Sequence, residues 1–210
     1  MIRVLIADDH PLLRSGLTHV LQKEPDFCPP GEAENSDQVI EKIKEKPWDV
    51  VVLDIAMPGR SGLEALSEIK KLRPGLPVLI MSMHSEEQFA IRSIKAGASG
   101  YLNKNEAVPE LVRAIRRILS GRKYVSAALA EVLAKAIESG DERPLHETLS
   151  DREYHVVCRI AAGQSVSEIA EETALSVKTI STYRTRALEK MSMRTNAELT
   201  RYAIRSGLVD

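Results

Sequence analysis

The chain has 210 residues, enough for one large domain or two small ones. Its 29 Lys and Arg and 30 Asp and Glu residues give a formal charge of −1, so bulk charge alone indicates neither a nucleic-acid-binding nor a membrane-surface protein. A content of 43% apolar and 28% charged residues excludes a wholly disordered chain. We find no apolar run of roughly 18 residues, no signal peptide and no metal or redox spacing around Cys28 and Cys158, and therefore expect a cytoplasmic protein.

The first half of the sequence alternates short aliphatic runs with amphipathic helical patterns. The continuous runs predict strands that are buried on both faces of a parallel sheet, over residues 2–7, 50–53, 77–81 and, more weakly, 100–102. A fifth strand over 27–32 contains Pro29 and Pro30, which are tolerated only at a sheet edge. Helices are expected over 12–22, 36–46, 63–72, 86–96 and 109–119. Five β/α repeats predict a doubly wound α/β domain over residues 1–123.

In the second half of the sequence the apolar residues recur with a different period. Residues 124–147 are expected to form a linker with a short alanine-rich helix, because residues 139–144 have the composition of an exposed connection. After the linker every segment has helical character. Ser150 and Ser165 each precede a glutamate at capping-box spacing, Ser176 can cap a third helix, and a fourth covers 195–206. These signals predict an all-α four-helix domain over residues 148–210.

Polar side chains follow the predicted strands of the first domain. Asp8 and Asp9 end the first strand, Asp54 ends the third, Ser82 ends the fourth, and Lys104 follows the fifth. Functional groups of open parallel sheets gather at the carboxyl ends of the strands. Any one of the aspartates alone, however, is equally well interpreted as a turn residue or a helix-capping residue. Closely packed carboxylates repel unless a cation such as Mg²⁺ offsets them. The set suits formation of an acyl phosphate, with metal and lysine neutralising phosphoryl charge.

The runs DDHP at 8–11, LDIAMPG at 53–59 and GYLNK at 100–104, together with Ser82, resemble the receiver domain of two-component response regulators. The resemblance implies a sheet of order 2-1-3-4-5, with the proline-containing strand at its edge. It implies that Asp54 is the phosphoacceptor. It further implies Mg²⁺ ligands at Asp8, Asp9, Asp54 and the carbonyl of Ala56, and phosphoryl-contacting or switch roles for Ser82, Tyr101 and Lys104. The sequence departs at Asn105, where many receivers have proline.

Phosphorylation at Asp54 would act as a local electrostatic switch. It adds about −1.5 to −2 charge, which draws the Ser82 hydroxyl toward the phosphate and lets the Tyr101 ring turn inward. His10 and His84 lack a second histidine at ligand spacing, so we interpret both as loop residues. His84 is also a candidate for setting the lifetime of the acyl phosphate.

The helical domain has a helix, tight turn, helix pattern, which suggests a helix-turn-helix whose second helix enters the DNA major groove. On that helix the apolar residues Val177, Ile180, Ala187, Leu188 and Met191 share one side. The other side carries hydroxyl and basic residues, and residues 176–194 hold five basic residues and one acid, a local charge of +4. Short hydroxyl side chains can read base edges while flanking cations contact phosphates, although charge alone would leave a solvated surface helix as the better interpretation.

The segments LSDRE at 149–153, IAE at 169–171, SVKTI at 176–180 and NAEL at 196–199 resemble the LuxR-type DNA-binding domain. The resemblance implies base-facing positions at Ser181, Thr182 and Thr185. It implies phosphate-contacting positions at Lys178, Thr179 and Arg186. Tyr183 and Met191 stand where the family usually has histidine and leucine, which concerns specificity rather than fold.

A receiver followed by this domain resembles the NarL/FixJ family of transcriptional response regulators. The resemblance implies a regulator rather than an enzyme: a sensor histidine kinase phosphorylates Asp54, autodephosphorylation reverses the signal, and phosphorylation switches homodimerisation and binding to paired half-sites in double-stranded DNA. RNA polymerase is a further expected partner, and a membrane is not; helices 12–22 and 109–119 are candidate dimer surfaces. Two alternatives stay open. A phosphohydrolase would need a cap and an acid where Ala56 stands, and a regulator that works without phosphorylation would leave the acidic pocket unexplained.

Overall fold

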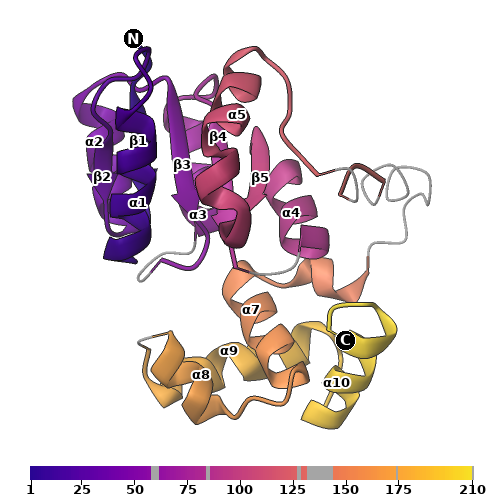
Figure 1. Cartoon of the computed structure of the whole chain (residues 1–210). Helices are drawn as coiled ribbons and strands as arrows, with labels where there is room; N and C mark the ends of the chain where they lie inside the picture. The colour runs from indigo at the N-terminus through magenta and orange to yellow at the C-terminus, as the bar shows by residue number, and fades with distance from the viewer. Residues whose placement is uncertain (58–61, 84–85, 127–128, 132–143, 174, 210) are drawn as a thin grey trace. The chain divides into compact units, whose positions relative to one another are not determined.

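The structure, a computed structural model, describes residues 1–57, 62–83, 86–126, 129–131, 144–173 and 175–209. The chain divides into two compact units, Met1–Ser139 and Gly140–Asp210 (Figure 1). The finer division expected at residues 123 and 148 stays a prediction, as does most of the alanine-rich helix, which lies outside the described residues. Within the described part of the chain, no helix combines the length and apolar character that a membrane crossing requires.

The first unit is built on a five-stranded, all-parallel sheet of order β2-β1-β3-β4-β5, which confirms the predicted order. The strands are β1 (Val4–Ala7), β2 (Gly31–Ala33), β3 (Val50–Asp54), β4 (Val78–Ser82) and β5 (Gly100–Asn103). Every residue of β1, β3 and β4 is buried, as expected for aliphatic strands covered on both faces. The edge strand β2 is shorter than predicted because Pro29 and Pro30 carry no backbone N–H to donate, and only Phe27 forms an isolated bridge, to Ile2.

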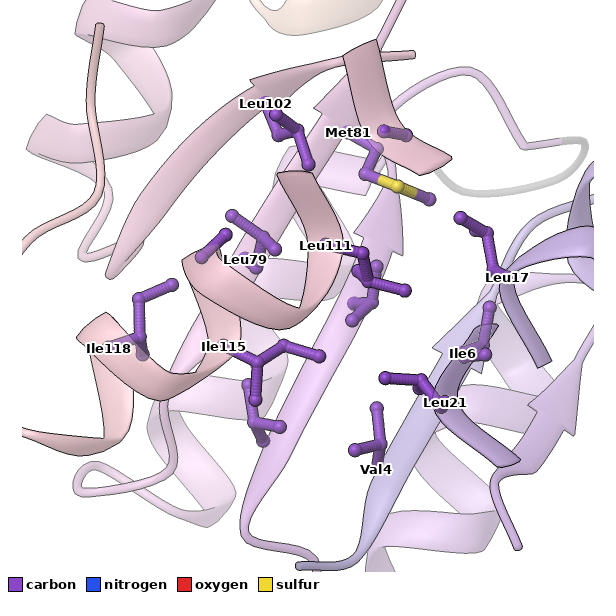
Figure 2. Packing of buried hydrophobic residues seen from close by; sticks show 14 of the residues in the cluster. Val4, Ile6, Leu17, Leu21, Leu79, Met81, Leu102, Leu111, Ile115 and Ile118 are labelled. Carbon is purple, nitrogen blue, oxygen red and sulfur yellow. The ribbon is translucent and has the colours of Figure 1, made fainter. Parts of the chain in front are cut away.

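Five helices cover the two faces of this sheet. They are α1 (Pro11–Gln22), α2 (Ser36–Glu45), α3 (Gly62–Leu72), α4 (Glu86–Lys95) and α5 (Ala107–Leu119), the last preceded by the 3₁₀ turn η1 (Lys104–Glu106). Helices α1 and α5 pack side by side on one face, and α2, α3 and α4 lie on the other (Figure 1). Figure 2 shows the core under α1 and α5, where Leu17, Leu21, Leu111 and Ile115 meet every second residue of the central strands.

The second unit is helical throughout its described part. It contains the 3₁₀ turn η2 (Leu145–Thr148), α7 (Asp151–Ala161), α8 (Val166–Glu172), α9 (Val177–Lys190) and α10 (Asn196–Arg205). The predicted capping boxes at Ser150 and Ser165 are present, and a third at Thr195 closes the start of α10. Gly163 ends α7 in the left-handed region, with φ of 92°. Val177, on the apolar side of the predicted helix, is 51% exposed, because it stands in the first turn of α9, ahead of the residues that reach the core.

Candidate functional site

The acidic side chains predicted at the strand ends lie together. The register pairs Ala7 with Leu53 and Asp54 with Met81, so the carboxyl ends of β1, β3 and β4 share one edge of the sheet. Asp8 and Asp54 are fully buried there. Ligand atoms of Asp8, Asp9, His10 and Asp54 all lie within 4.8 Å of one another. The strand-end argument therefore placed the three carboxylates correctly in space.

Lys104 is the cation of this cluster, which we call the acidic pocket (Asp8, Asp9, Asp54 and Lys104). Its Nζ lies 2.6 Å from Asp54 Oδ2 and 2.8 Å from Asp8 Oδ2, and its side chain is 4% exposed. The backbone N–H of Ala56 donates to Asp54 Oδ1 at 3.0 Å. The N–H of Asn105 donates to the side chain of Asn103 at 2.9 Å, and this bond forms part of the turn that carries Lys104 back over the pocket.

One buried ammonium is thus shared between two buried carboxylates. Burial is the largest influence on Asp54 and raises its pKa above the ordinary value, although Lys104 and the Ala56 N–H act to lower it. Burial is also the largest influence on Lys104 and lowers its pKa, but Asp54 and Asp8 together outweigh that effect, so the pKa of Lys104 is raised. Lys104 therefore only partly offsets the effect of burial on the pKa of Asp54.

The donor set fits a hard divalent cation. Asp8 Oδ2 and Asp9 Oδ1 are buried, and each is contacted by one side-chain nitrogen, Lys104 Nζ and His10 Nδ1 respectively, at 2.8 Å. Carboxylate oxygens are the ligands that Mg²⁺ prefers, and these two have lone pairs left to bind it. His10 was expected to be a loop residue, and it is one, but its Nδ1 faces Asp9 at the mouth of the pocket. The sequence-based interpretation considered only a second histidine as a partner of His10, so it did not include this carboxylate. His84 lies outside the described residues.

The predicted switch residues are both buried. Ser82 ends β4, and the Tyr101 ring is 1% exposed, the inward position that the sequence argument assigned to the phosphorylated protein. The backbone N–H of Tyr101 donates to the carbonyl of Tyr124 at 2.9 Å, and the N–H of Tyr124 donates to the carbonyl of Ser99 at 3.1 Å. Because a Cβ on Gly100 would stand 2.7 Å from the Tyr124 carbonyl oxygen, only glycine admits this pairing. The chain after α5 is therefore joined to the strand that carries Tyr101, which sequence analysis missed.

Helix α9 presents the hydroxyl and basic face expected for the second helix of the motif. Lys178, Thr182, Thr185 and Arg186 are exposed, whereas Ser181 and Thr179 are half-buried. The hydroxyl groups of Thr182 and Thr185 donate to the carbonyls one turn earlier, at 2.9 and 3.0 Å, so their hydrogens are already used within the helix. The opposite face is anchored in the unit's core by buried apolar residues, namely Ile180, Ala187, Leu188 and Met191.

An ion pair that sequence analysis did not anticipate joins the end of α9 to the start of α7. Lys190 Nζ lies 2.6 Å from Glu153 Oε2, and the same carboxylate accepts from the N–H of Ser150 at 2.7 Å. Burial, which raises the pKa of Glu153, is the largest single influence, but the bonds from Lys190 and Ser150 together lower it below the ordinary value. The capping glutamate is therefore also the link between two helices.

Comparison with known proteins covers both units. Residues 4–116 match the response regulator receiver domain, and residues 147–203 match the bacterial regulatory proteins of the luxR family. The chain is 38% identical to the response regulator GacA of Pseudomonas protegens over 100% of this chain and 99% of that protein. It is 36% identical to the response regulator UvrY of Escherichia coli over 99% and 96%.

Solved structures agree along nearly the whole chain. An RcsB–DNA complex is 27% identical, with a TM-score of 0.61, over 97% of this chain and 98% of that one. RcsB from Salmonella enterica serovar Typhimurium, bound to a promoter in the presence of the phosphomimetic BeF₃⁻, is 28% identical, with a TM-score of 0.61, over 96% and 97%. Together with the two domain matches, these likenesses show that the chain belongs to the NarL/FixJ family of two-component response regulators, with a receiver domain and a LuxR-type helix-turn-helix DNA-binding domain.

Proposed function

We propose that a sensor histidine kinase phosphorylates this regulator on Asp54 in the presence of Mg²⁺, and that phosphorylation switches homodimerisation and binding to paired DNA half-sites to regulate transcription. One observation carries the proposal: the buried carboxylate of Asp54 lies 2.6 Å from Lys104 Nζ, with the oxygens of Asp8 and Asp9 beside it. The domain division at residues 1–123, 124–147 and 148–210, a cytoplasmic location and contact with RNA polymerase belong to the same proposal.

The residues of the pocket have distinct roles in phosphoryl transfer. Asp54 attacks the phosphorus of a phosphohistidine, so that an O–P bond forms while the N–P bond breaks and the imidazole leaves with that electron pair. Asp8, Asp9, Asp54 and the carbonyl of Ala56 would hold Mg²⁺, which offsets phosphoryl charge when bound. Lys104 neutralises the remaining phosphoryl oxygens, and the hydroxyl of Ser82 is drawn toward the new charge, while the Tyr101 ring already occupies the inward position. Slow attack of water on the acyl phosphate resets the protein.

Phosphate uptake from acetyl phosphate tests the role of Asp54. With Mg²⁺, the native chain should shift on a phosphate-affinity gel; the shift should not form when Mg²⁺ is left out, and hydroxylamine, which attacks the acyl carbon and releases phosphate, should remove it. Asp54→Asn should abolish the shift because the amide nitrogen is no nucleophile. Asp49→Asn is the matched control, since Asp49 immediately precedes β3 but pairs with Arg3 outside the pocket. Retained uptake by Asp54→Asn would contradict the proposal.

For DNA binding, we propose that α9 is the reading helix. Ser181, Thr182 and Thr185 face bases, and Lys178, Thr179 and Arg186 contact phosphates. The exposure of Lys178 and Arg186, neither of which has an ion-pair partner among the described residues, supports phosphate contact. The exposure of Thr182 and Thr185 supports contact with base edges, where a threonine methyl group can meet the methyl group of thymine.

Two substitutions separate these roles. Lys178→Ala should weaken binding to all DNA sequences and reduce the slope of log affinity against log salt by about 1. Thr182→Ala should leave that slope unchanged and alter the preferred base at one position of each half-site. Lys44→Ala, which removes the same charge from an exposed position of α2, is the control and should change neither. If Lys178→Ala and Thr182→Ala both kept native affinity and preference, α9 would not be the reading helix.

A further inference from the structure

Arg14 is a buried cation of the receiver unit that phosphoryl chemistry does not use directly. It stands in the first turns of α1, and its side chain is only 9% exposed. Its guanidinium makes three hydrogen bonds, to the carbonyl of Asp8 at 2.7 Å, to Glu32 Oε2 at 2.9 Å and to Glu34 Oε1 at 2.8 Å. The three bonds use Nη1, Nε and Nη2, so each nitrogen of the group has a partner.

The bond to the Asp8 carbonyl bears directly on the acidic pocket. That oxygen belongs to the peptide between Asp8 and Asp9, and fixing the peptide plane fixes the direction in which both carboxylates leave the backbone. The other side of Asp8 is held as well, because its N–H donates to the carbonyl of Ala33 at 3.1 Å. Arg14 thus completes a two-sided clamp on the backbone of Asp8, whose carboxylate lies in the acidic pocket beside that of Asp9.

The three hydrogen bonds of Arg14 require a rigid, planar group that donates in several directions. A guanidinium can donate in three directions at once, whereas a lysine ammonium on a flexible stem holds one acceptor firmly. Glu32 and Glu34 are 43% and 61% exposed, so water hydrates both without help from Arg14. The two glutamates therefore serve to hold the guanidinium in the orientation that reaches the Asp8 carbonyl. By contrast, Arg116 pairs with Glu24 and Asp26 on the surface, 48% exposed, and has no contact with the pocket backbone.

We infer that Arg14 is a positioning residue for the divalent-cation site: by holding the Asp8 carbonyl it sets the geometry of the Asp8 and Asp9 carboxylates that bind the ion. This inference rests on the proposed function, because it assumes that the acidic pocket binds Mg²⁺. Groups that orient metal ligands typically contribute 10- to 100-fold in metal affinity. The charge of Arg14 acts in the opposite direction, since a cation near the site repels Mg²⁺.

Calorimetric titration of the full-length chain with Mg²⁺ tests the inference. Arg14→Gln should bind Mg²⁺ about tenfold more weakly than the native chain. Arg14→Lys, which keeps the charge but not the planar guanidinium, should also bind more weakly than the native chain, and Arg116→Gln should bind as the native chain does. Because loss of a positive charge alone would tighten binding, weaker binding by Arg14→Gln identifies the held carbonyl as the cause. Native affinity in Arg14→Gln, or full recovery in Arg14→Lys, would overturn the inference.

Two further measurements keep the test decisive. Fluorescence of Trp48, the single tryptophan, reports whether each variant is folded before titration. If Arg14→Gln does not fold, the double variant Glu32→Gln/Glu34→Gln replaces it. This variant keeps Arg14 but removes the two carboxylates that orient its guanidinium, so it should weaken Mg²⁺ binding to a smaller extent. Unchanged binding would overturn the inference. Failure of the native chain to bind Mg²⁺ would instead contradict the proposed function.

Discussion

The receiver unit and the DNA-binding unit differ in the surroundings of the charged groups that we propose to be functional. Asp8, Asp54 and Lys104 are buried in the acidic pocket, whereas Lys178 and Arg186 on α9 are exposed. Charges in a buried site interact strongly and are little screened, so one added phosphoryl group changes the balance of the whole pocket. Exposed cations interact weakly until a polyanion such as DNA approaches, and salt then competes with them. Burial thus suits a site that responds to one added charge, and exposure suits a surface that binds DNA.

The two units also differ in how buried acids respond to pH. The pKa of Asp54 is raised, chiefly by burial, so its ionisation opposes folding. The pKa of Glu153 is lowered, because the bonds from Lys190 and Ser150 outweigh burial, and its ionisation favours folding. The receiver unit therefore gives up stability to hold its functional charge, and the DNA-binding unit gains stability from a charge that links its helices.

The largest effect is expected for Lys104→Met. The substitution leaves Asp8 and Asp54 buried without their shared cation, which should lower the free energy of unfolding of the receiver unit by about 3 kcal/mol at neutral pH. Urea unfolding followed by Trp48 fluorescence measures this unit, and Lys44→Met on the surface should change it by less than about 0.5 kcal/mol. If Lys104→Met and Lys44→Met lowered the free energy of unfolding equally, burial would not be what makes the Lys104 charge important for stability.

A smaller effect is expected for Glu153→Gln in the DNA-binding unit, about 1 kcal/mol at neutral pH. A carboxyl whose pKa is lowered on folding stabilises above its ordinary titration range and loses that contribution as the pH falls through its folded pKa. The deficit of Glu153→Gln should therefore shrink in acid. Urea unfolding followed by circular dichroism measures it, with Trp48 fluorescence unchanged. Glu168→Gln, in the capping box without a lysine partner among the described residues, should cost less.

The smallest effect, and one of opposite sign, is expected for Asp54→Asn. A carboxyl whose pKa is raised on folding destabilises increasingly as the pH rises from its ordinary range through the folded pKa. The amide lacks this penalty, so the variant should be more stable than the native chain at neutral pH, and the difference should vanish below the ordinary range of aspartate. Trp48 fluorescence checks it. A loss of stability that grows with pH would show that the pocket favours the ionised acid.

The fold was largely predictable because its signals are local. Continuous aliphatic runs, capping residues and strand-end polar groups each lie within a few residues of one another, and parallel strands bring their carboxyl ends to one edge. The strand-end rule therefore placed Asp8, Asp9 and Asp54 together. Local pattern does not give burial, however: a helical wheel treats every turn alike, so it does not show that Val177 precedes the core.

The remaining parts of the candidate sites depend on contacts between distant residues. Arg14 meets its glutamates across 18 and 20 positions, and Glu153 meets Lys190 across 37. No motif or period marks such pairs, because each side chain alone has the character of an ordinary helix residue. Tyr124 has the same property, since its pairing with β5 is visible only once α5 has returned the chain to the sheet edge.

The pairing of Tyr124 with β5 also protects an open strand. β5 is the last strand of the sheet, and an unpaired edge is a template on which another chain can add a strand. The Tyr124 backbone occupies the N–H of Tyr101 and the carbonyl of Ser99, and the Lys123 side chain donates to the carbonyl of Ala98. A receiver shortened at Leu119 would lose all three contacts, and its β5 edge would be free for self-association. An isolated receiver that stays monomeric should therefore extend through Ser126.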